Sequence, residues 1–94
     1  MSVEEAKILL VDDDADILLA AKFLLKKHFR TIITADGPHP VDNILKEDKI
    51  DLALLDMNYS TGATSGREGF DLLKKIRQKS PSTRVIMMTA YGDI

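Results

Sequence analysis

Four short apolar runs, rich in aliphatic and β-branched side chains, set the strongest limit on how this chain folds. They occupy residues 7–11, 31–35, 51–55 and 84–88. Runs of this length with few polar interruptions are typical of strands that are buried on both faces of a sheet. The segments between them carry apolar residues at spacings of three and four, which predicts helices. This alternating order predicts right-handed crossovers and a parallel sheet.

The first predicted helix is the best defined of the three. Asp14 is a suitable N-cap, and the helix dipole favours Asp16 in the first turn. Weaker patterns predict helices around residues 41–49 and 70–79, and residues 57–68, with two glycines and several hydroxyls, predict a long exposed loop. The first helix is expected to run for roughly 14 residues, and its apolar positions are Ile17, Leu18, Ala21, Leu24, Leu25 and His28.

Length and composition indicate one small globular domain that spans residues 1–94. The chain stops just after its fourth predicted strand, whereas a doubly wound domain normally continues, so we expect a domain that is incomplete at its C-terminus. No segment approaches the ~20 apolar residues of a membrane span. The first residues place acids before a short apolar run, unlike a signal peptide, so we predict a cytoplasmic protein.

Charge and cysteine content narrow the chemistry. The net charge is −2, which argues against a direct nucleic-acid surface, since such a surface needs a basic stripe. The absence of cysteine excludes disulfides, thiolate metal sites and cysteine nucleophiles.

Polar residues follow three of the predicted strands. Asp12 and Asp13 come after the first, Asp56 after the third and Thr89 after the fourth. In a parallel sheet these strand ends share the edge where ligands bind. Clustered carboxylates repel one another unless a cation compensates, and oxygen ligands select Mg²⁺ or Mn²⁺. Because Mg²⁺ needs only one or two protein carboxylates, we predict that Asp12 and Asp13 hold the metal while Asp56 accepts a phosphoryl group.

The segments ILLVDDDAD, LALLDMN and VIMMTAYGD together resemble the response-regulator receiver domain of two-component signalling, over nearly the whole chain. The resemblance implies a flavodoxin-like α/β fold, a doubly wound parallel sheet of strand order 2-1-3-4-5, here truncated after the fourth strand. It also implies a phosphoacceptor, not a turnover enzyme. Such a domain takes a phosphoryl group from a sensor histidine kinase and switches conformation to control an output domain, most often in transcription.

The resemblance also assigns roles to individual residues. Asp56 matches the phosphoacceptor and joins the metal set, Asp13 the direct Mg²⁺ ligand, and Asp12 the acid that acts through water. Asn58 matches the position whose backbone carbonyl binds the metal. Thr89 matches the switch hydroxyl, although a threonine at a strand end is also an ordinary structural choice.

Two features depart from the family pattern. The loop at 57–68 is enlarged, as in some receivers attached to sigma-54-dependent transcription activators, and either gates the site or is a tolerated insertion. The family lysine at the end of a fifth strand has no counterpart, and Lys7 cannot replace it by position. The missing strand would leave residues 85–88 on an exposed apolar edge, which predicts self-association.

Two other functions fit parts of the pattern. The acids at 12–14 also resemble the Asp-x-Asp of haloacid-dehalogenase-like phosphohydrolases, with Asp12 as nucleophile, but that leaves Asp56 without a role. The third alternative is an interaction module that is no longer phosphorylated. Phosphate labelling from a small donor in Mg²⁺ distinguishes these functions.

Overall fold

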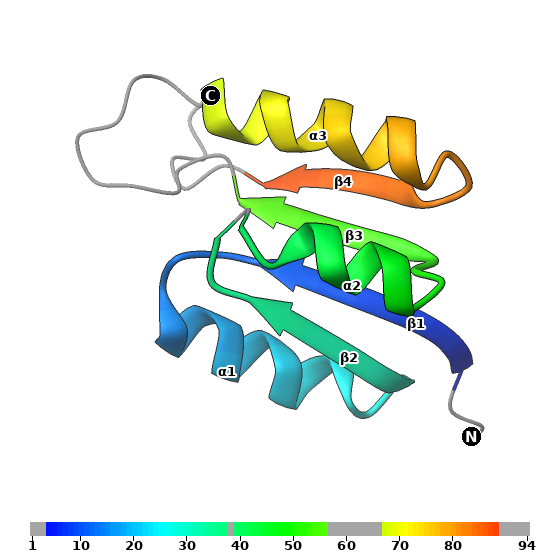
Figure 1. Cartoon of the computed structure of the whole chain (residues 1–94). Helices are drawn as coiled ribbons and strands as arrows, with labels where there is room; N and C mark the ends of the chain where they lie inside the picture. Colours follow the sequence, from blue (N-terminus) through cyan, green and yellow to red (C-terminus); the bar gives the residue numbers. More distant parts are fainter. Residues whose placement is uncertain (1–3, 38, 57–66, 89–94) are drawn as a thin grey trace.

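The computed structural model describes residues 4–37, 39–56 and 67–88. It contains four parallel strands in the order β2-β1-β3-β4, joined through three helices (Figure 1). The predicted parallel sheet and the order of its first four strands are confirmed. The elements are β1 (Glu4–Val11), α1 (Ala15–Leu25), β2 (Phe29–Ala35), α2 (Val41–Glu47), β3 (Leu52–Asp56), α3 (Arg67–Lys79) and β4 (Arg84–Met88).

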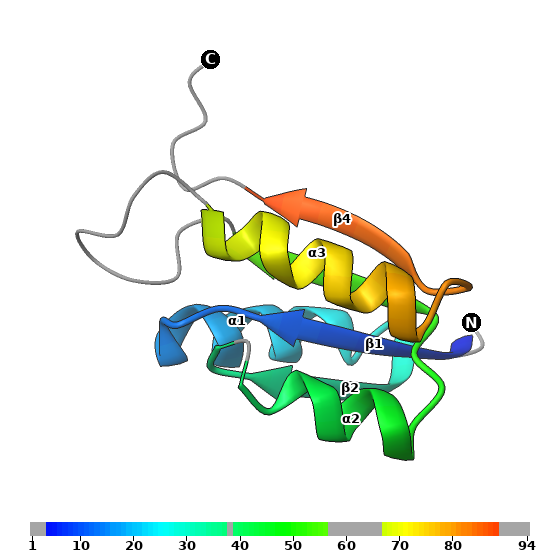
Figure 2. The ribbon, with the colours of Figure 1, turned by 45° about the horizontal axis from the view of Figure 1, so that its top comes forward.

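The two faces of the sheet are covered unequally. Helices α2 and α3 lie on one face and α1 lies on the other (Figure 2). Alternate residues of each strand point to opposite faces, so neighbours along β1 enter different clusters. The cluster beneath α2 and α3 is the larger: Leu9, Val11, Ala35, Val41, Ile50, Ala53, Leu55, Leu72 and Ile76. Among the described residues, the buried members of the cluster beneath α1 are Ile8, Leu10 and Ile32.

Helix α1 differs from its prediction in both length and orientation. It spans 11 residues, and none of them is buried. Leu18, Ala21 and Leu25 pack on the cluster beneath the helix, as predicted. Ile17 and Leu24, which were predicted on the same face, are 50% and 60% exposed. The apolar pattern of α1 extends almost around the helix, whereas the sheet covers only one side, so periodicity alone overstates its burial.

Several other boundaries move by a few residues. Strands β1 and β2 start at Glu4 and Phe29, earlier than the apolar runs indicated, because pairing extends beyond the apolar residues. Helix α3 starts at Arg67, inside the segment predicted as loop. The rest of that loop lies outside the described residues. Most of the added residues are polar, such as Glu4, Glu5 and Arg30, and so supplied no continuous apolar signal.

Polar contacts fasten the edge of the sheet at which the strands begin. The Lys7 backbone N–H donates to Asp51 Oδ2 at 2.8 Å, and Lys7 Nζ pairs with Asp48 Oδ1 at 2.8 Å. The buried Thr83 hydroxyl donates to the Ile50 carbonyl at 2.6 Å. Lys7 therefore lies within β1 and far along it from the acidic residues at the other end, so it cannot serve them, as expected.

Candidate functional site

The site predicted from the sequence depends on where three strands end. In the parallel register, Val11 of β1 pairs with Ala35 of β2 and with Leu55 of β3. Asp12 and Asp56 each follow these paired positions by one residue. Strands in a sheet lie about 4.8 Å apart. The main chain at Asp56 therefore lies at the same edge of the sheet as that of Asp12, and the two are not at opposite ends.

Strand β4 ends at that same edge. Asp56, the last residue of β3, pairs in register with Met88, the last residue of β4. Thr89 follows Met88 directly in sequence. The structure of Thr89, that of Asn58 and the side chain of Asp56 lie outside the described residues. The described backbone thus brings Asp12, Asp56 and the end of β4 to one edge of the sheet, and the roles of the side chains there remain predictions.

Asp12 is the most enclosed charged residue of the described chain, with only 7% of its surface exposed. Its backbone N–H donates to the Ala35 carbonyl at 3.1 Å, which prolongs the pairing with β2. Its carboxylate Oδ1 accepts the Asp14 backbone N–H at 2.9 Å. An aspartate that binds the backbone two residues later is a common turn former. The Asp12 carboxylate is therefore held in a fixed orientation at the edge of the sheet.

The three consecutive aspartates divide into different roles. Asp14 caps α1, as predicted: its Oδ1 accepts the backbone N–H groups of Asp16 and Ile17 at 2.9 and 3.3 Å. Asp13 lies between the cap and the buried Asp12, and it is exposed. The part of Asp14 in orienting Asp12 was missed from the sequence. The Asp-x-Asp spacing is the signal that could have indicated this turn.

The donor set at this edge fits a hard divalent cation. Among the described side chains, no three carboxylates or imidazoles gather as a metal cluster. Asp12 and Asp13 are adjacent carboxylate residues at the end of β1, and the register places the main chain of Asp56 at the same edge. Oxygen ligands without nitrogen or sulfur suit Mg²⁺, which binds through one or two carboxylates and keeps several waters. The residues present therefore fit Mg²⁺.

The surroundings of the acidic edge are apolar on the side of α1. The helix starts directly after Asp14, and its side chains Leu19 and Phe23 are 69% and 67% exposed. A shallow hollow of about 260 Å³ lies between α1 and β2, with Leu18 and Thr34 in its lining. Exposed apolar surface next to a charged site is typical of a protein-binding face. No helix in the described part of the chain is long and apolar enough to span a bilayer.

Comparison with known proteins identifies the class that this fold and edge define. The response regulator receiver domain family matches residues 8–94. The chain is 37% identical over 89 residues to sporulation initiation phosphotransferase F of Bacillus subtilis, covering 94% of this chain and 67% of that protein. It is 42% identical over 88 residues to the transcriptional regulatory protein CpxR of Escherichia coli, covering 93% of this chain and 34% of that protein.

The solved structures agree. The N-terminal receiver domain of a two-component response regulator from Bacteroides fragilis superposes with a TM-score of 0.81 at 33% identity, covering 96% of this chain and 70% of that one. The chain belongs to the response regulator receiver domain family and has its flavodoxin-like fold. It is a receiver domain of two-component signalling. Receiver domains accept phosphoryl groups, typically with Mg²⁺, and interact with histidine kinases and output domains.

Proposed function

We propose that Asp56 accepts a phosphoryl group from a sensor histidine kinase, with Asp12 and Asp13 holding Mg²⁺ at the same edge. The observation that carries this proposal is the register of β1 against β3, which pairs Val11 with Leu55 and so brings the three aspartates to one edge. Family membership favours Asp56 over Asp12 as the acceptor, and with it a receiver over a phosphohydrolase.

In the transfer, an Asp56 carboxylate oxygen attacks the phosphorus of a phosphohistidine. The phosphorus–nitrogen bond breaks, an acyl phosphate forms, and the imidazole leaves with the electron pair and takes up a proton from solvent. A bound Mg²⁺ supplies charge neutralisation for the phosphoryl oxygens. Asp12 is buried and its carboxylate is held in place by the Asp14 backbone N–H, so it would offer the metal a carboxylate of fixed orientation. Asn58 contributes its backbone carbonyl, and the Thr89 hydroxyl turns to the new phosphoryl group.

The kinase docks on the exposed apolar side of α1. Helix α1 begins beside the acidic edge, and Leu19 lies nearer to that edge than Phe23, so a partner seated on the first turns of α1 can reach the edge at which β3 ends. Solvent-exposed aromatic and aliphatic residues beside a polar site are the usual anchors of such interfaces. The phosphorylated receiver, a cytoplasmic protein, then acts on an output domain in transcription. The enlarged loop resembles those of receivers that work with sigma-54-dependent activators.

The test is labelling with acetyl phosphate in Mg²⁺, read by intact-protein mass spectrometry. Asp56→Asn is expected to abolish the label, and Asp13→Asn to reduce it about tenfold or more, as when groups that support a metal are removed. Asp71→Asn, an exposed carboxylate on α3, is the matched control and is expected to label normally. Chelation of Mg²⁺ should abolish labelling of the unmodified chain.

The alternatives predict different results. Label that persists in Asp56→Asn and maps to Asp12 would favour the phosphohydrolase. No label on the unmodified chain, with a circular dichroism spectrum that shows it folded, would favour a module that only binds partners.

A further inference from the structure

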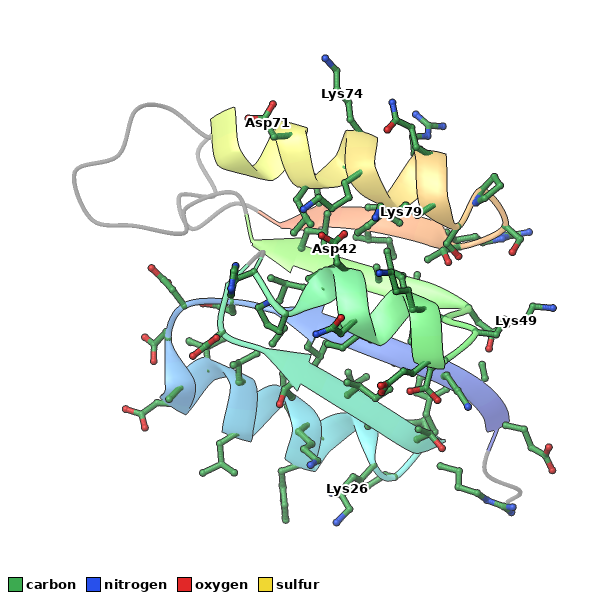
Figure 3. The ribbon with its side chains drawn as sticks, viewed as in Figure 1. Lys26, Asp42, Lys49, Asp71, Lys74 and Lys79 are labelled. Carbon is green, nitrogen blue, oxygen red and sulfur yellow. The ribbon has the colours of Figure 1, made fainter. Side chains whose placement is uncertain are left out.

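The outer face of α1, which is directed away from the sheet, changes in character from one end of the helix to the other. Asp16 lies in the first turn, and Lys26 and Lys27 directly follow the last turn. Figure 3 shows Lys26 directed away from the sheet. Between these ends lie Leu19 and Phe23, which are 69% and 67% exposed. The face is therefore acidic at one end, apolar in the middle and basic at the other end.

The residues of this outer face recur at helical spacing. Residues three or four apart lie side by side on a helix, and the side that packs on the sheet carries Leu18, Ala21 and Leu25. Lys27 Nζ lies 5.8 Å from the centre of the Phe23 ring, so these two side chains share the outer side. The exposed residues of the outer face, from start to end, are Asp16, Leu19, Ala20, Phe23 and Lys27.

Two properties of the outer face go beyond what a single helix needs. The helix dipole alone favours acids at the start and bases at the end of a helix, but it gives no reason for two large apolar side chains to stay exposed between them. Among the described residues, neither Asp16 nor Lys27 forms an ion pair within its own chain. The outer face thus has the charge and the apolar surface to match a copy of itself.

We propose that two copies of this chain pair through the outer face of α1, with the two helices antiparallel about a two-fold axis between Ala20 and Phe23. In that register, Phe23 of one copy packs on Leu19 and Ala20 of the second copy. Asp16 of one copy lies opposite Lys27 of the second copy. Each contact occurs twice, as the symmetry of an isologous interface requires. The interface is centred on one short helix, so the dimer is weak and reversible.

Charge selects the antiparallel arrangement. A parallel pair would set Asp16 against Asp16 and Lys27 against Lys27, and like charges repel. The antiparallel pair sets the two Asp16 residues about 16 Å apart along the helices, about eleven residues at ~1.5 Å each. Each carboxylate then meets a lysine, and the positive end of each helix dipole meets the negative end of the other.

The pairing has a consequence for phosphorylation. The proposed kinase docking surface uses Leu19 and Phe23, so pairing and docking exclude each other. This consequence rests on the proposed function, whereas the pairing itself does not. Helix α1 packs on β1 and β2, while Asp56 is the last residue of β3. The paired copy therefore leaves the end of β3 open to a small phosphoryl donor.

Single cysteines test the pairing directly, because the chain contains none. Ala20→Cys lies next to the two-fold axis and is expected to give a disulfide-linked dimer on mild oxidation. The matched control is Asn43→Cys, an exposed and uncharged position of α2 on the other face of the sheet. An equal yield of crosslinked dimer from both variants, or none from Ala20→Cys, would overturn the proposal.

Two further cysteine variants determine the direction of the helices. Asp16→Cys mixed with Lys27→Cys should give a mixed disulfide, because the two positions lie opposite each other in the antiparallel pair. Asp16→Cys alone should give little crosslinked dimer. Efficient crosslinking of Asp16→Cys to itself would indicate parallel helices and refute the proposed geometry.

Sedimentation equilibrium measures the apolar contribution. Phe23→Lys should raise the dimer dissociation constant tenfold or more, because the dimer contains this side chain twice. The control Ile17→Lys makes the same kind of change at an exposed residue of α1 outside the outer face, and it should leave the dissociation constant unchanged. Equal dissociation constants for Phe23→Lys and the unmodified chain would assign any self-association to another surface and reject this one.

Charge reversal measures the polar contribution in the same experiment. Asp16→Lys alone and Lys27→Asp alone should each raise the dissociation constant roughly fivefold, because each replaces two attractions by two repulsions. An equimolar mixture of the two variants should recover the affinity of the unmodified chain, because both pairs are then of opposite sign. A mixture that associates no better than either variant alone would contradict the proposed pairs.

Acetyl phosphate in Mg²⁺ separates this inference from the proposed function. The crosslinked Ala20→Cys dimer is expected to label as fully as the reduced monomer. Label on the monomer and none on the dimer would mean that pairing covers the acidic edge, contrary to the geometry. No label on either would remove the acceptor role of Asp56 and retain the pairing. Full labelling of a chain that never crosslinks would retain the acceptor and remove the pairing.

Discussion

The two faces of the sheet reach the same fold by different degrees of burial. Under α2 and α3, nine buried apolar residues form one cluster, and further side chains from both helices close over it. Under α1, three buried residues are covered by a helix that has no fully buried residue of its own. The first face holds the domain together. The second face leaves apolar side chains of α1 exposed to solvent, which is typical of a protein-binding surface.

Polar contacts also differ between the two faces of the sheet. Asp42 of α2 lies between Lys75 and Lys79 of α3, with Nζ–carboxylate distances of 3.4 and 3.2 Å, and Figure 3 shows its carboxylate directed towards Lys79. These pairs join two helices across one face. Around α1 the polar contacts described above are local: the Asp14 cap, and Lys27 just beyond the helix, with its Nζ 5.8 Å from the centre of the Phe23 ring. These contacts stabilise helix α1 itself and do not tie it to another helix.

The largest expected loss of stability comes from a substitution in the core under α2 and α3. Ile76→Ala deletes a side chain that is fully buried, and should lower the free energy of unfolding by about 2–5 kcal/mol. Leu25→Ala on the α1 face, where the side chain is only partly buried, should cost about 1 kcal/mol. Urea unfolding followed by circular dichroism measures both. Equal losses would mean that the two faces contribute alike, contrary to the comparison.

A smaller effect is expected where α1 begins. Asp14→Ala removes the acceptor of two backbone N–H groups and should lower the free energy of unfolding by about 1 kcal/mol. Asp14→Ser should restore most of that loss, because serine also caps helices. Comparable urea midpoints for Asp14→Ala and the unmodified chain would show that the sheet, and not the cap, fixes α1.

The smallest effect concerns the ion pairs between α2 and α3. Hydrogen bonding to Lys79, opposed by some desolvation, and then to Lys75 holds the pKa of Asp42 below its ordinary value of 3.8. A lowered folded-state pKa stabilises the fold above the ordinary value, and that contribution is lost as the pH falls through the folded value. Asp42→Asn should therefore be slightly less stable than the unmodified chain at neutral pH.

The same variant should match the unmodified chain in acid, where Asp42 is protonated. Added salt should also narrow the difference at neutral pH, because the pairs are partly exposed. Thermal unfolding at both pH values measures the difference. A gap between the two proteins that persists in acid would assign the effect of the substitution to packing instead of charge.

The sequence predicted the features that depend on neighbouring residues in the chain, and it did not predict which side chains are buried by packing against other elements. The four strands and the Asp14 cap follow from apolar runs and turn chemistry, and the order of the strands follows from the family resemblance; all are confirmed. The exposure of Ile17 and Leu24 could not be predicted, because helical periodicity does not say how many sides of a helix find a neighbour. The start of α3 at Arg67 was missed since its first turn is polar.

In the candidate site, too, one part was predicted from the sequence and another part was not. Strand ends and parallel pairing are sufficient to predict that Asp12, Asp13 and Asp56 share an edge, and the register agrees. The fixed orientation of Asp12 comes from the backbone N–H of residue 14, and the only sequence signal for it is that aspartate at position 12 is a common turn former. The roles of Asn58 and Thr89 stay predictions from the family resemblance.

The wholly parallel register bears on how the chain acquires its structure during synthesis. No two neighbouring strands are joined by a hairpin, so every pairing has to close a loop that contains a helix. The central strand β1 leaves the ribosome first, yet its second partner, β3, follows some forty residues later. Topologies of this kind fold slowly, and their apolar segments wait unpaired. Of the four described strands, β1 is made first, so its apolar run Ile8–Val11 waits for both of its partners in a growing chain.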